Sequence, residues 1–309
     1  MMASPVDSPS TPVGLERPSS LRVWMLATRP KTLPASIAPL LVGSAVAVHE
    51  GGFHAVTAMV ALLTALLLQI AANLANDALD FRRGADTATR TGPTRIVASG
   101  FVTAEEVLRA TVFVLVLATI SGLYLVWHGG WPFLLLGIFA LVCAVAYTGG
   151  PWPLAYLGLG EVFVFIFFGP IAVTGTAYLQ TLDVTTLSLA ASIPTGLMAV
   201  CILIVNNVRD LEQDRLVGKR TIAVRIGDRP SRREYVLIQL GTLALPFLFW
   251  AQGWMNAWSL LTILSWPLFW QLWRQIGTLG GAQLNPTLGA TGRTSLVFSV
   301  LFSVALILG

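Results

Sequence analysis

Two long apolar runs of the sequence end in clusters of asparagine and aspartate that are spaced for metal chemistry. The first cluster contains Asn76 and Asp80, and the second contains Asn206, Asp210 and Asp214. Side chains four residues apart lie one turn apart on a helix, so the residues of each cluster share one helix face. Carboxylate and amide oxygens suit a hard cation such as Mg²⁺, which keeps part of its water shell and bridges to phosphate oxygens. The sequence therefore predicts two magnesium-binding faces.

Basic residues lie close to both clusters. They are Arg82, Arg83, Arg90, Arg95, Arg209, Arg215, Lys219, Arg220 and Arg225. Several carboxylates in one cavity repel each other and retain protons unless cations compensate for their charge. Metal ions with a second layer of Arg and Lys describe a site for a polyanion, and a diphosphate with a hydrocarbon tail fits a membrane setting. Arg229, Arg232 and Arg233 are equally consistent with anchoring at the membrane surface.

The composition places these clusters in a membrane protein. Of the 309 residues, 55% are hydrophobic and 11% are charged, with a mean hydropathy of +0.74; soluble domains have roughly 45–50% apolar and 25% charged residues. We therefore predict an all-α membrane protein with nine transmembrane helices around a central cavity. The predicted spans are residues 31–49, 54–76, 105–127, 131–148, 157–179, 185–206, 234–251, 254–273 and 293–309.

The distribution of basic residues predicts the orientation. The connections around 49–53, 128–131, 180–184 and 252–255 contain no Lys or Arg, and neither does the C-terminus. The positive-inside rule puts the N-terminus and both clusters in the cytoplasm and the C-terminus outside, in a multi-pass protein of the cell inner (plasma) membrane. This topology and attraction to anionic lipid account for the net charge of +4 without nucleic acid as a partner.

The chain divides into a tail and one membrane domain. Residues 1–20, rich in Pro and Ser, are predicted to be a disordered cytoplasmic tail, and residues 21–309 the transmembrane domain. Four helices separate the two clusters, which predicts two four-helix units of similar design plus a ninth helix. Cys143 and Cys201 lie inside predicted spans without a Cys-x-x-Cys spacing, which is typical of core thiols.

The two cluster regions carry a family resemblance. The segments NLANDALDFRRGADTATRTGPTRIVASG and NNVRDLEQDRLVGKRTIAVRIG resemble the paired motifs of the UbiA superfamily of intramembrane prenyltransferases. RPKTLPASIAPLLVGSA, YTGGPWPLAYLGLGEVFVFIFFGP and LNPTLGATGR support the resemblance over roughly residues 21–309. Gly84 with an acid at Asp86 is similar to the menaquinone branch of the superfamily. Ala78 and Leu79 depart from that branch, whose members often have an aromatic residue between the acids.

The resemblance implies roles for individual residues. The implied metal ligands are Asn76 and Asp80, with Asn73, Asp77 and Asp86 beside them, and Asn206, Asp210 and Asp214. Lys219 and Arg225 would contact the diphosphate, and the charge argument adds Arg95 and Arg209. We expect catalysis to depend on Asp80, Asp210, Lys219 and Tyr147, whose ring face can shield a carbocation. Glu161 either helps to deprotonate a ring hydroxyl or is a polar helix contact.

The resemblance also implies a reaction. Mg²⁺ would assist ionisation of a polyprenyl diphosphate, and a ring carbon of 1,4-dihydroxy-2-naphthoate would capture the cation and lose its carboxylate as CO₂. The expected ligands are thus a polyprenyl diphosphate, an aromatic acceptor and the lipid bilayer, with no obligate protein partner evident. Two alternatives stay open: another acceptor or donor within the superfamily (4-hydroxybenzoate, homogentisate, haem, chlorophyllide or a phytyl group), and a cation-coupled transporter.

Overall fold

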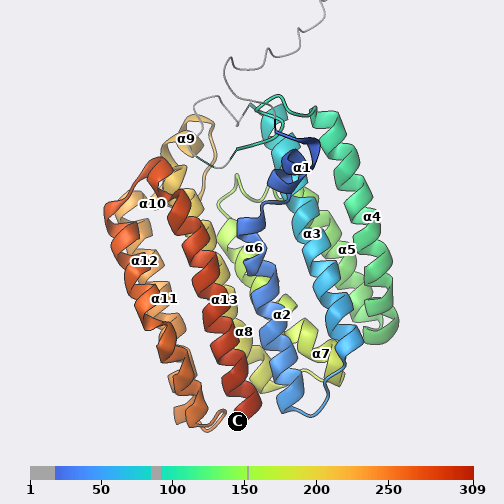
Figure 1. Cartoon of the computed structure of the whole chain (residues 1–309), viewed down its shortest axis with the longest axis vertical. Helices are drawn as coiled ribbons and strands as arrows, with labels where there is room; N and C mark the ends of the chain where they lie inside the picture. The colour runs from blue at the N-terminus through green and yellow to red at the C-terminus, as the bar shows by residue number, and fades with distance from the viewer. Residues whose placement is uncertain (1–17, 85–91, 93, 152) are drawn as a thin grey trace, which may run out of the picture.

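The chain forms one bundle of helices. The computed structural model describes residues 18–84, 92, 94–151 and 153–309, and within these ranges it contains no strand. The longer helices run side by side between the two ends of the bundle (Figure 1). They are α2 (Pro34–His49), α3 (Ala55–Arg82), α4 (Ala104–Gly129), α5 (Trp131–Ala146), α8 (Thr186–Arg209), α11 (Asp228–Ala251), α12 (Trp266–Thr278) and α13 (Asn285–Leu308).

Short helical segments connect and extend the long helices. They are α1 (Ser20–Thr28), η1 (Pro30–Thr32), α6 (Gly160–Ile166), η2 (Phe167–Thr174), α7 (Gly175–Thr181), α9 (Leu211–Leu216), α10 (Ile222–Ile226), η3 (Ala257–Ser265) and η4 (Gly281–Leu284). Of these, α1, α9 and α10 lie at the upper end of the bundle in Figure 1, whereas the C-terminus lies at the lower end. Because α6, η2 and α7 follow one another without a gap, they form one continuous helical run.

Six helical runs of the described residues are long and apolar enough to cross a bilayer: α3, α4, Gly160–Thr181, α8, α11 and Gly281–Leu308. The all-helical, multi-pass prediction is thereby confirmed. The predicted spans 131–148 and 254–273 correspond to α5 and to η3 with α12, which are not among the six. The α5 helix has 16 residues, and the second segment is divided between a 3₁₀ stretch of nine residues and an α-helix of 13. The count of nine spans is therefore not confirmed.

The first predicted span is bent rather than straight. The segments Ser20–Thr32 and Pro34–His49 meet at an angle of 52° and together would make a seventh crossing. Arg29, at the bend, has a left-handed backbone with φ of 51° and is followed by Pro30. Since proline has no N–H to donate, helix α1 cannot continue through it. The bend places Arg29 in the wall of a pocket at the upper end of the bundle.

Local sequence fixes where α4 begins. Thr103 Oγ1 accepts a hydrogen bond from the Glu106 N–H at 3.2 Å, and Glu106 Oε2 accepts one from the Thr103 N–H at 2.7 Å. This reciprocal capping box satisfies amide groups that the first turn leaves without helical partners. Because the capping box sets the start of α4, it also sets the end of the preceding segment, which carries Arg95.

Glycines allow three of the central segments to touch backbone to backbone. A Cβ on Gly43 of α2 would lie 2.4 Å from the Val173 carbonyl oxygen of η2. A Cβ on Gly196 of α8 would lie 3.0 Å from Gly169 Cα and 3.0 Å from the Phe165 carbonyl oxygen. In a bilayer, helices associate through such close packing, because lipid tails are as apolar as the side chains. Helix α2, segment η2 and helix α8 thus form a tightly packed centre.

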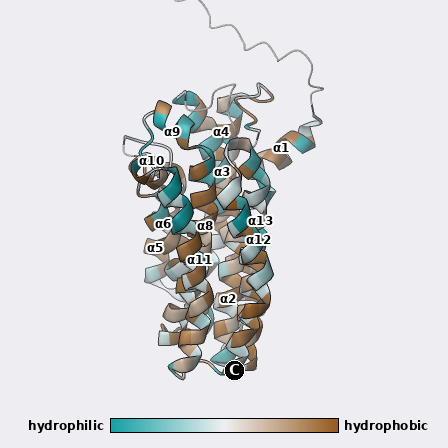
Figure 2. Ribbon diagram, turned by 90° about the vertical axis from the view of Figure 1, so that its left-hand side faces the viewer, coloured by the Kyte–Doolittle hydropathy of each residue, from teal (hydrophilic) through white to brown (hydrophobic). Residues whose placement is uncertain are grey.

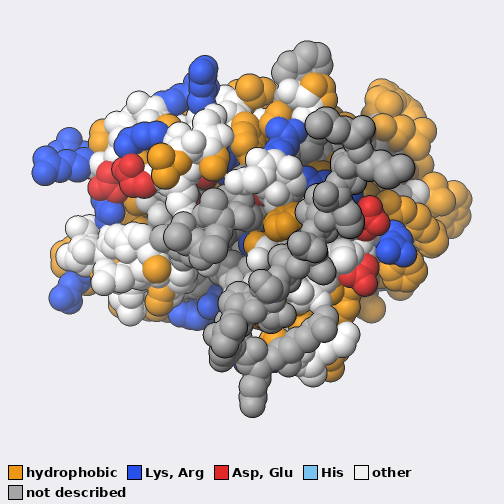
Figure 3. Space-filling view, turned by 90° about the horizontal axis from the view of Figure 1, so that it is seen from above, with side chains coloured by type: hydrophobic (Ala, Val, Ile, Leu, Met, Phe, Trp, Pro, Cys, Tyr) orange, Lys and Arg blue, Asp and Glu red, His pale blue; other side chains and the backbone are white. Residues whose placement is uncertain are grey.

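The two ends of the bundle differ in polarity. Hydrophilic residues gather toward the end with α9, among some apolar ones, whereas much of the rest of the bundle is apolar in Figure 2. Seen from this end, Lys, Arg, Asp and Glu side chains are spread over the surface of the described residues (Figure 3). Both predicted clusters lie here, at the end of α3 and at the junction of α8 with α9.

Candidate active site

A polar pocket opens between the upper ends of α3, α6 and α8. Its lining includes residues of each cluster together with polar residues that face them. These nine residues are Arg29, Asn76, Asp80, Arg95, Tyr147, Glu161, Asn206, Asn207 and Lys219. The sequence predicted six of these as metal, diphosphate or catalytic residues, and the structure brings them together: Asn76, Asp80, Arg95, Tyr147, Asn206 and Lys219. Asp86 lies outside the described residues.

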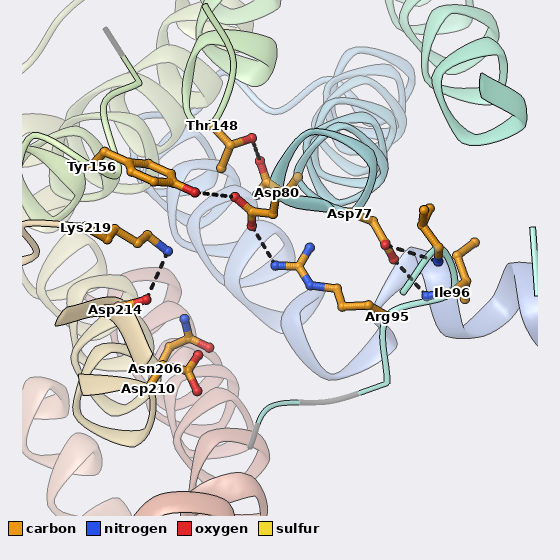
Figure 4. Close-up of polar contacts among 12 residues, drawn as sticks. Asp77, Asp80, Arg95, Ile96, Thr148, Tyr156, Asn206, Asp210, Asp214 and Lys219 are labelled. Carbon is orange, nitrogen blue, oxygen red and sulfur yellow. Dashed lines mark hydrogen bonds and ion pairs between the residues drawn. The ribbon is translucent and has the colours of Figure 1, made fainter. Parts of the chain in front are cut away.

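The first cluster is set on α3, which continues past the predicted end of the span at residue 76 to Arg82. The Asp80 carboxylate is buried and accepts a hydrogen bond from Arg95 Nη2 at 2.8 Å and one from the Tyr156 hydroxyl at 3.2 Å. One turn earlier, Asn76 Oδ1 accepts a hydrogen bond from the Thr148 hydroxyl at 2.7 Å. Figure 4 shows these partners arriving from two loops onto one face of α3. The predicted Asn76 and Asp80 face is confirmed.

Two other predicted ligands have different partners. The Asp77 carboxylate accepts hydrogen bonds from the backbone N–H groups of Ile96 at 3.1 Å and Val97 at 3.4 Å, on the side of α3 away from Asp80 (Figure 4). Asn73 donates to the Thr28 carbonyl at 3.0 Å and to the Thr32 hydroxyl at 3.3 Å. Asp77 therefore holds the segment that carries Arg95, and Asn73 holds the bend between α1 and α2.

The second cluster does not continue a regular helix. Helix α8 ends at Arg209, and Asp210 has the non-helical angles φ −96° and ψ 7° before α9 begins. The Asp210 N–H still bonds to the Asn206 carbonyl at 3.1 Å, and the Asp214 N–H to the Asp210 carbonyl at 2.8 Å. The three side chains thus keep the predicted one-turn spacing although the helix is interrupted between them.

Arg209 binds the cluster itself. Its Nε and Nη2 donate to the two Asp210 carboxylate oxygens at 2.8 and 2.6 Å, and Nη2 also donates to Asn206 Oδ1 at 2.6 Å. Its Nη1 reaches Asn285 Oδ1 on α13 at 3.1 Å, and its side chain is fully enclosed. A bidentate guanidinium fixes carboxylate orientation. Arg209 therefore orients the second cluster and joins it to α13, whereas the sequence had assigned it to the diphosphate.

Arg225 is also engaged elsewhere. Its Nη2 donates to the Leu157 carbonyl at 2.7 Å and its Nε donates to the Arg220 carbonyl at 3.2 Å. Gly158 leaves room for this contact, since a Cβ there would lie 2.9 Å from the Arg225 guanidinium carbon. In this structure Arg225 clamps the loop that carries Tyr156, and it does not line the pocket.

Lys219 lies between the two clusters. Its Nζ is 3.6 Å from Asp214 Oδ1 and 5.5 Å from the centre of the Tyr156 ring. The guanidinium carbon of Arg83 also lies over this ring, 5.4 Å from its centre. Burial raises the pKa of Asp214 to about 6, and the Lys219 ammonium opposes this shift. Burial, followed by the Asp80 charge, also raises the pKa of the Tyr156 phenol. The phenol therefore stays protonated and donates to Asp80.

Sequence reasoning missed four of the residues that shape the site. They are Arg29, Thr148, Tyr156 and Asn207. The Arg29-Pro30 pair is a sequence feature that could have pointed to Arg29. The second asparagine of the Asn206-Asn207 pair could have pointed to Asn207. Thr148 and Tyr156 lie in the connection between α5 and α6, and nothing in their local sequence indicates that they bond to the first cluster.

The oxygen donors of the two clusters fit a magnesium ion chemically. Asn76, Asp80, Asn206, Asp210 and Asp214 offer only amide and carboxylate oxygens, which Mg²⁺ prefers. In the part of the chain that the structure describes, no three His, Cys, Asp or Glu side chains converge on one point. Each carboxylate is instead bound to a basic side chain, as Figure 4 shows for Asp80 and Asp214. Such a donor set suits an ion whose coordination shell is completed by water and phosphate oxygens.

The fold and the site define a multi-pass membrane protein with a charge-balanced, oxygen-rich pocket at one end of its bundle. The model of the UbiA prenyltransferase family matches residues 36–278. The chain is 35% identical to the 1,4-dihydroxy-2-naphthoate octaprenyltransferase of Escherichia coli (strain K12), over 94% of this chain and 96% of that protein. With the Mycobacterium tuberculosis protein of the same name it shares 36% identity, over 94% and 99% of the two chains. The chain belongs to the UbiA prenyltransferase family, as the motif segments predicted.

Solved structures agree with the fold. A UbiA homolog from Archaeoglobus fulgidus, bound to GPP and Mg²⁺, superposes with a TM-score of 0.66 over 93% of this chain and 100% of that chain, at 16% identity. A UbiA homolog from Aeropyrum pernix K1 gives a TM-score of 0.65 at the same identity. At this level of identity the likeness concerns the fold.

Proposed function

We propose that this protein transfers the prenyl group of a polyprenyl diphosphate to 1,4-dihydroxy-2-naphthoate, with release of CO₂ and diphosphate, and so forms demethylmenaquinol. The observation that carries the proposal is one pocket bordered by two oxygen-rich clusters and by Lys219 and Arg95. The near full-length relatives named for this acceptor support the choice of substrate. A menaquinone-type acceptor is favoured over the other superfamily acceptors for the same reason.

The roles of the residues follow from their present partners. We assign Asn76 and Asp80 to one magnesium site, and Asn206, Asp210 and Asp214 to the other. Bound Mg²⁺ would neutralise charge on the diphosphate and make it a better leaving group. The two ions would also compensate for the carboxylates, which now rely on Arg95, Arg209 and Lys219.

Cationic side chains and aromatic rings complete the site. Lys219 and Arg95 lie beside the carboxylates on the pocket wall, so they are placed to bind diphosphate oxygens once metal ions take their partners. Arg209 and Arg225, which hold the second cluster and the Tyr156 loop, support the site from outside it. Tyr147 lines the pocket, where its ring face can stabilise an allylic cation.

The membrane topology is part of the proposal. We propose nine spans, formed by α1 with α2, by α3, α4 and α5, by the α6–α7 run, by α8 and α11, by η3 with α12, and by α13, arranged as two four-helix units plus one around a laterally open cavity. Most of the predicted tail, residues 1–17, lies outside the described residues, and residues 21–309 would form the membrane domain. The pocket end would face the cytoplasm of the inner membrane, since the connections at the other end lack Lys and Arg.

A transfer assay tests the proposed function. Purified protein in lipid vesicles is supplied with Mg²⁺, a polyprenyl diphosphate and naphthoate labelled at its carboxyl carbon. The expected result is labelled CO₂ in step with prenylated naphthoquinol, and no product after chelation of the metal. Prenylation that retains the label would reject the decarboxylating reaction. Prenylation of another acceptor from a panel, with none of the naphthoate, would reject the substrate and keep the family chemistry.

A further inference from the structure

Two carboxyl groups beside the pocket, those of Glu161 and Glu234, differ from the aspartates of the two clusters. The described aspartates of the two clusters each bind an Arg, a Lys or a pair of backbone amides. Glu161 and Glu234 have no ion-pair partner among the described residues, and the only charged group in contact with each is the other glutamate. Glu161 is buried and Glu234 is partly exposed with one enclosed oxygen. An enclosed charge without a partner is strongly unfavourable, so this pair needs another explanation.

The two glutamates meet beside the pocket. Glu161 stands in the first turn of α6, is 7% exposed and lines the pocket. Its Oε1 accepts a hydrogen bond from Asn207 Nδ2 at 3.5 Å, and its side chain is in hydrogen-bond contact with that of Glu234 on α11. Glu234 Oε2 is enclosed and receives no hydrogen bond from an N–H or hydroxyl group of the described residues.

A hydrogen bond between two carboxyl groups requires a proton. An ionised carboxylate can only accept, so one of the pair must carry a hydrogen for the contact to be attractive. Two carboxylates in contact repel each other, which opposes ionisation of both at once. The contact therefore requires at least one proton. A pair that holds a single proton can accept a second one and return it.

We propose that the Glu161–Glu234 pair stores the proton of the prenyl acceptor during transfer. Glu161, which faces the pocket, takes the proton from the acceptor hydroxyl next to the attacked ring carbon and gives it back to the same oxygen after CO₂ has left. Glu234, behind Glu161, holds the proton that the pair already shares. This inference rests on the proposed function and adds a proton acceptor to it, since each described aspartate of the clusters is already bound to a cation or to backbone amides.

The atoms and charges of this sequence balance. As the carbon–oxygen bond to the diphosphate breaks, the ring carbon that bears the carboxylate bonds to the allylic carbon. The electron pair of the hydroxyl O–H bond forms a carbonyl, and the proton moves to Glu161. When the bond to the carboxylate breaks, its electron pair restores the aromatic ring and CO₂ departs. The oxygen recovers the stored proton, so the cycle consumes and releases no net proton.

A series of acceptors whose hydroxyl groups differ in acidity tests the inference. We would compare the wild-type protein with Glu161→Gln on naphthoates whose ring halogens make the hydroxyl progressively more acidic. Loss of a general base lowers turnover by about 10²–10⁴-fold, and we expect a loss in this range on the parent acceptor. The loss should shrink as the hydroxyl becomes more acidic, because less help is needed to remove its proton. The KM for the prenyl diphosphate should not change.

Further variants separate a proton role from a packing role. Glu161→Asp should recover part of the turnover, and Glu234→Gln should show a smaller loss with the same dependence on acceptor acidity. Glu212→Gln is the matched control, because Glu212 pairs with Arg215 on the surface. Each variant is checked for a single elution peak and an unchanged unfolding temperature in detergent, and Glu161→Asp replaces Glu161→Gln if the latter does not fold.

The outcomes are distinct. A loss that is the same for every acceptor, or no loss at all, overturns the proton-storage inference while leaving the proposed function in place. Failure of the wild-type protein to prenylate the parent naphthoate overturns the proposed function and this inference with it. A loss that falls with acceptor acidity at constant donor KM supports both.

Discussion

Asp77→Ala should destabilise the protein without altering its response to Mg²⁺. The Asp77 side chain, in a residue that is 2% exposed, is the hydrogen-bond acceptor for the backbone N–H groups of Ile96 and Val97. These two residues are 0% and 3% exposed, so water cannot replace the lost carboxylate. A buried donor left without a partner costs about 1–3 kcal/mol. The 3.4 Å bond to Val97 is longer than the usual range, and we therefore expect the free energy of unfolding to fall by about 2–4 kcal/mol.

Unfolding of the purified protein in bicelles, followed by its tryptophan fluorescence, measures this change. Asp77→Asn is the matched variant, because its single side-chain oxygen can still accept one of the two bonds, and about half of the loss is expected. Residual turnover of either variant should show the wild-type dependence on Mg²⁺. Wild-type stability together with a weakened Mg²⁺ response would refute the reasoning and place Asp77 among the metal ligands.

Four further outcomes follow from the site. Asp80→Asn and Asp210→Asn should each lower turnover by about 10²-fold or more, because each removes an electrostatic partner of the transition state. Elution in detergent should not change, and near-normal turnover of either variant would contradict the two-cluster assignment. Lys219→Ala should raise the KM for prenyl diphosphate by roughly 10–100-fold, from the loss of about 1.5–3 kcal/mol of a charged hydrogen bond, and an effect confined to the acceptor KM would contradict it. Because the pKa of Asp214 is raised to about 6, a proton on Asp214 should compete with Mg²⁺ below that pH. Titration calorimetry measures the Mg²⁺ affinity, and an affinity that stays constant from pH 7 to pH 5 would argue against Asp214 as a ligand. Tyr156→Phe removes one bond to Asp80 and should lower turnover by about fivefold, with a loss as large as that of Asp80→Asn pointing to a direct role.

Much of the fold was predictable because the signals are strong and local. Long apolar runs indicated where the membrane helices lie in the sequence. The absence of Lys and Arg from alternate connections indicated which connections lie at the same end of the bundle. The one-turn spacing of Asn76 and Asp80 fixed their common face. The sequence could not show that α3 continues to Arg82 or that Asp210 interrupts a helix, since polar residues at a helix end are compatible with either course.

The roles of the arginines were harder to predict, because a guanidinium binds a phosphate, a carboxylate or a carbonyl with the same donors. Only the structure distinguishes Arg209, which is enclosed against Asp210 and Asn285, from Arg95, which lines the pocket. The Glu161 and Glu234 contact joins helices far apart in the sequence, and no spacing rule connects them. Asp86 stays a prediction.

The glycine contacts at the centre of the bundle bear on the transporter alternative. Transporters expose one site to each side of the membrane in turn, mostly by rocking one group of helices against another. In this protein Gly43 of α2 contacts the backbone of η2, and Gly169 of η2 contacts Gly196 of α8. No side chain separates these backbones. Rocking would have to separate these backbones, and a close-packed interior resists such shear. Such a closely packed centre favours a fixed frame, in which substrates come to the pocket from its open end or from the lipid.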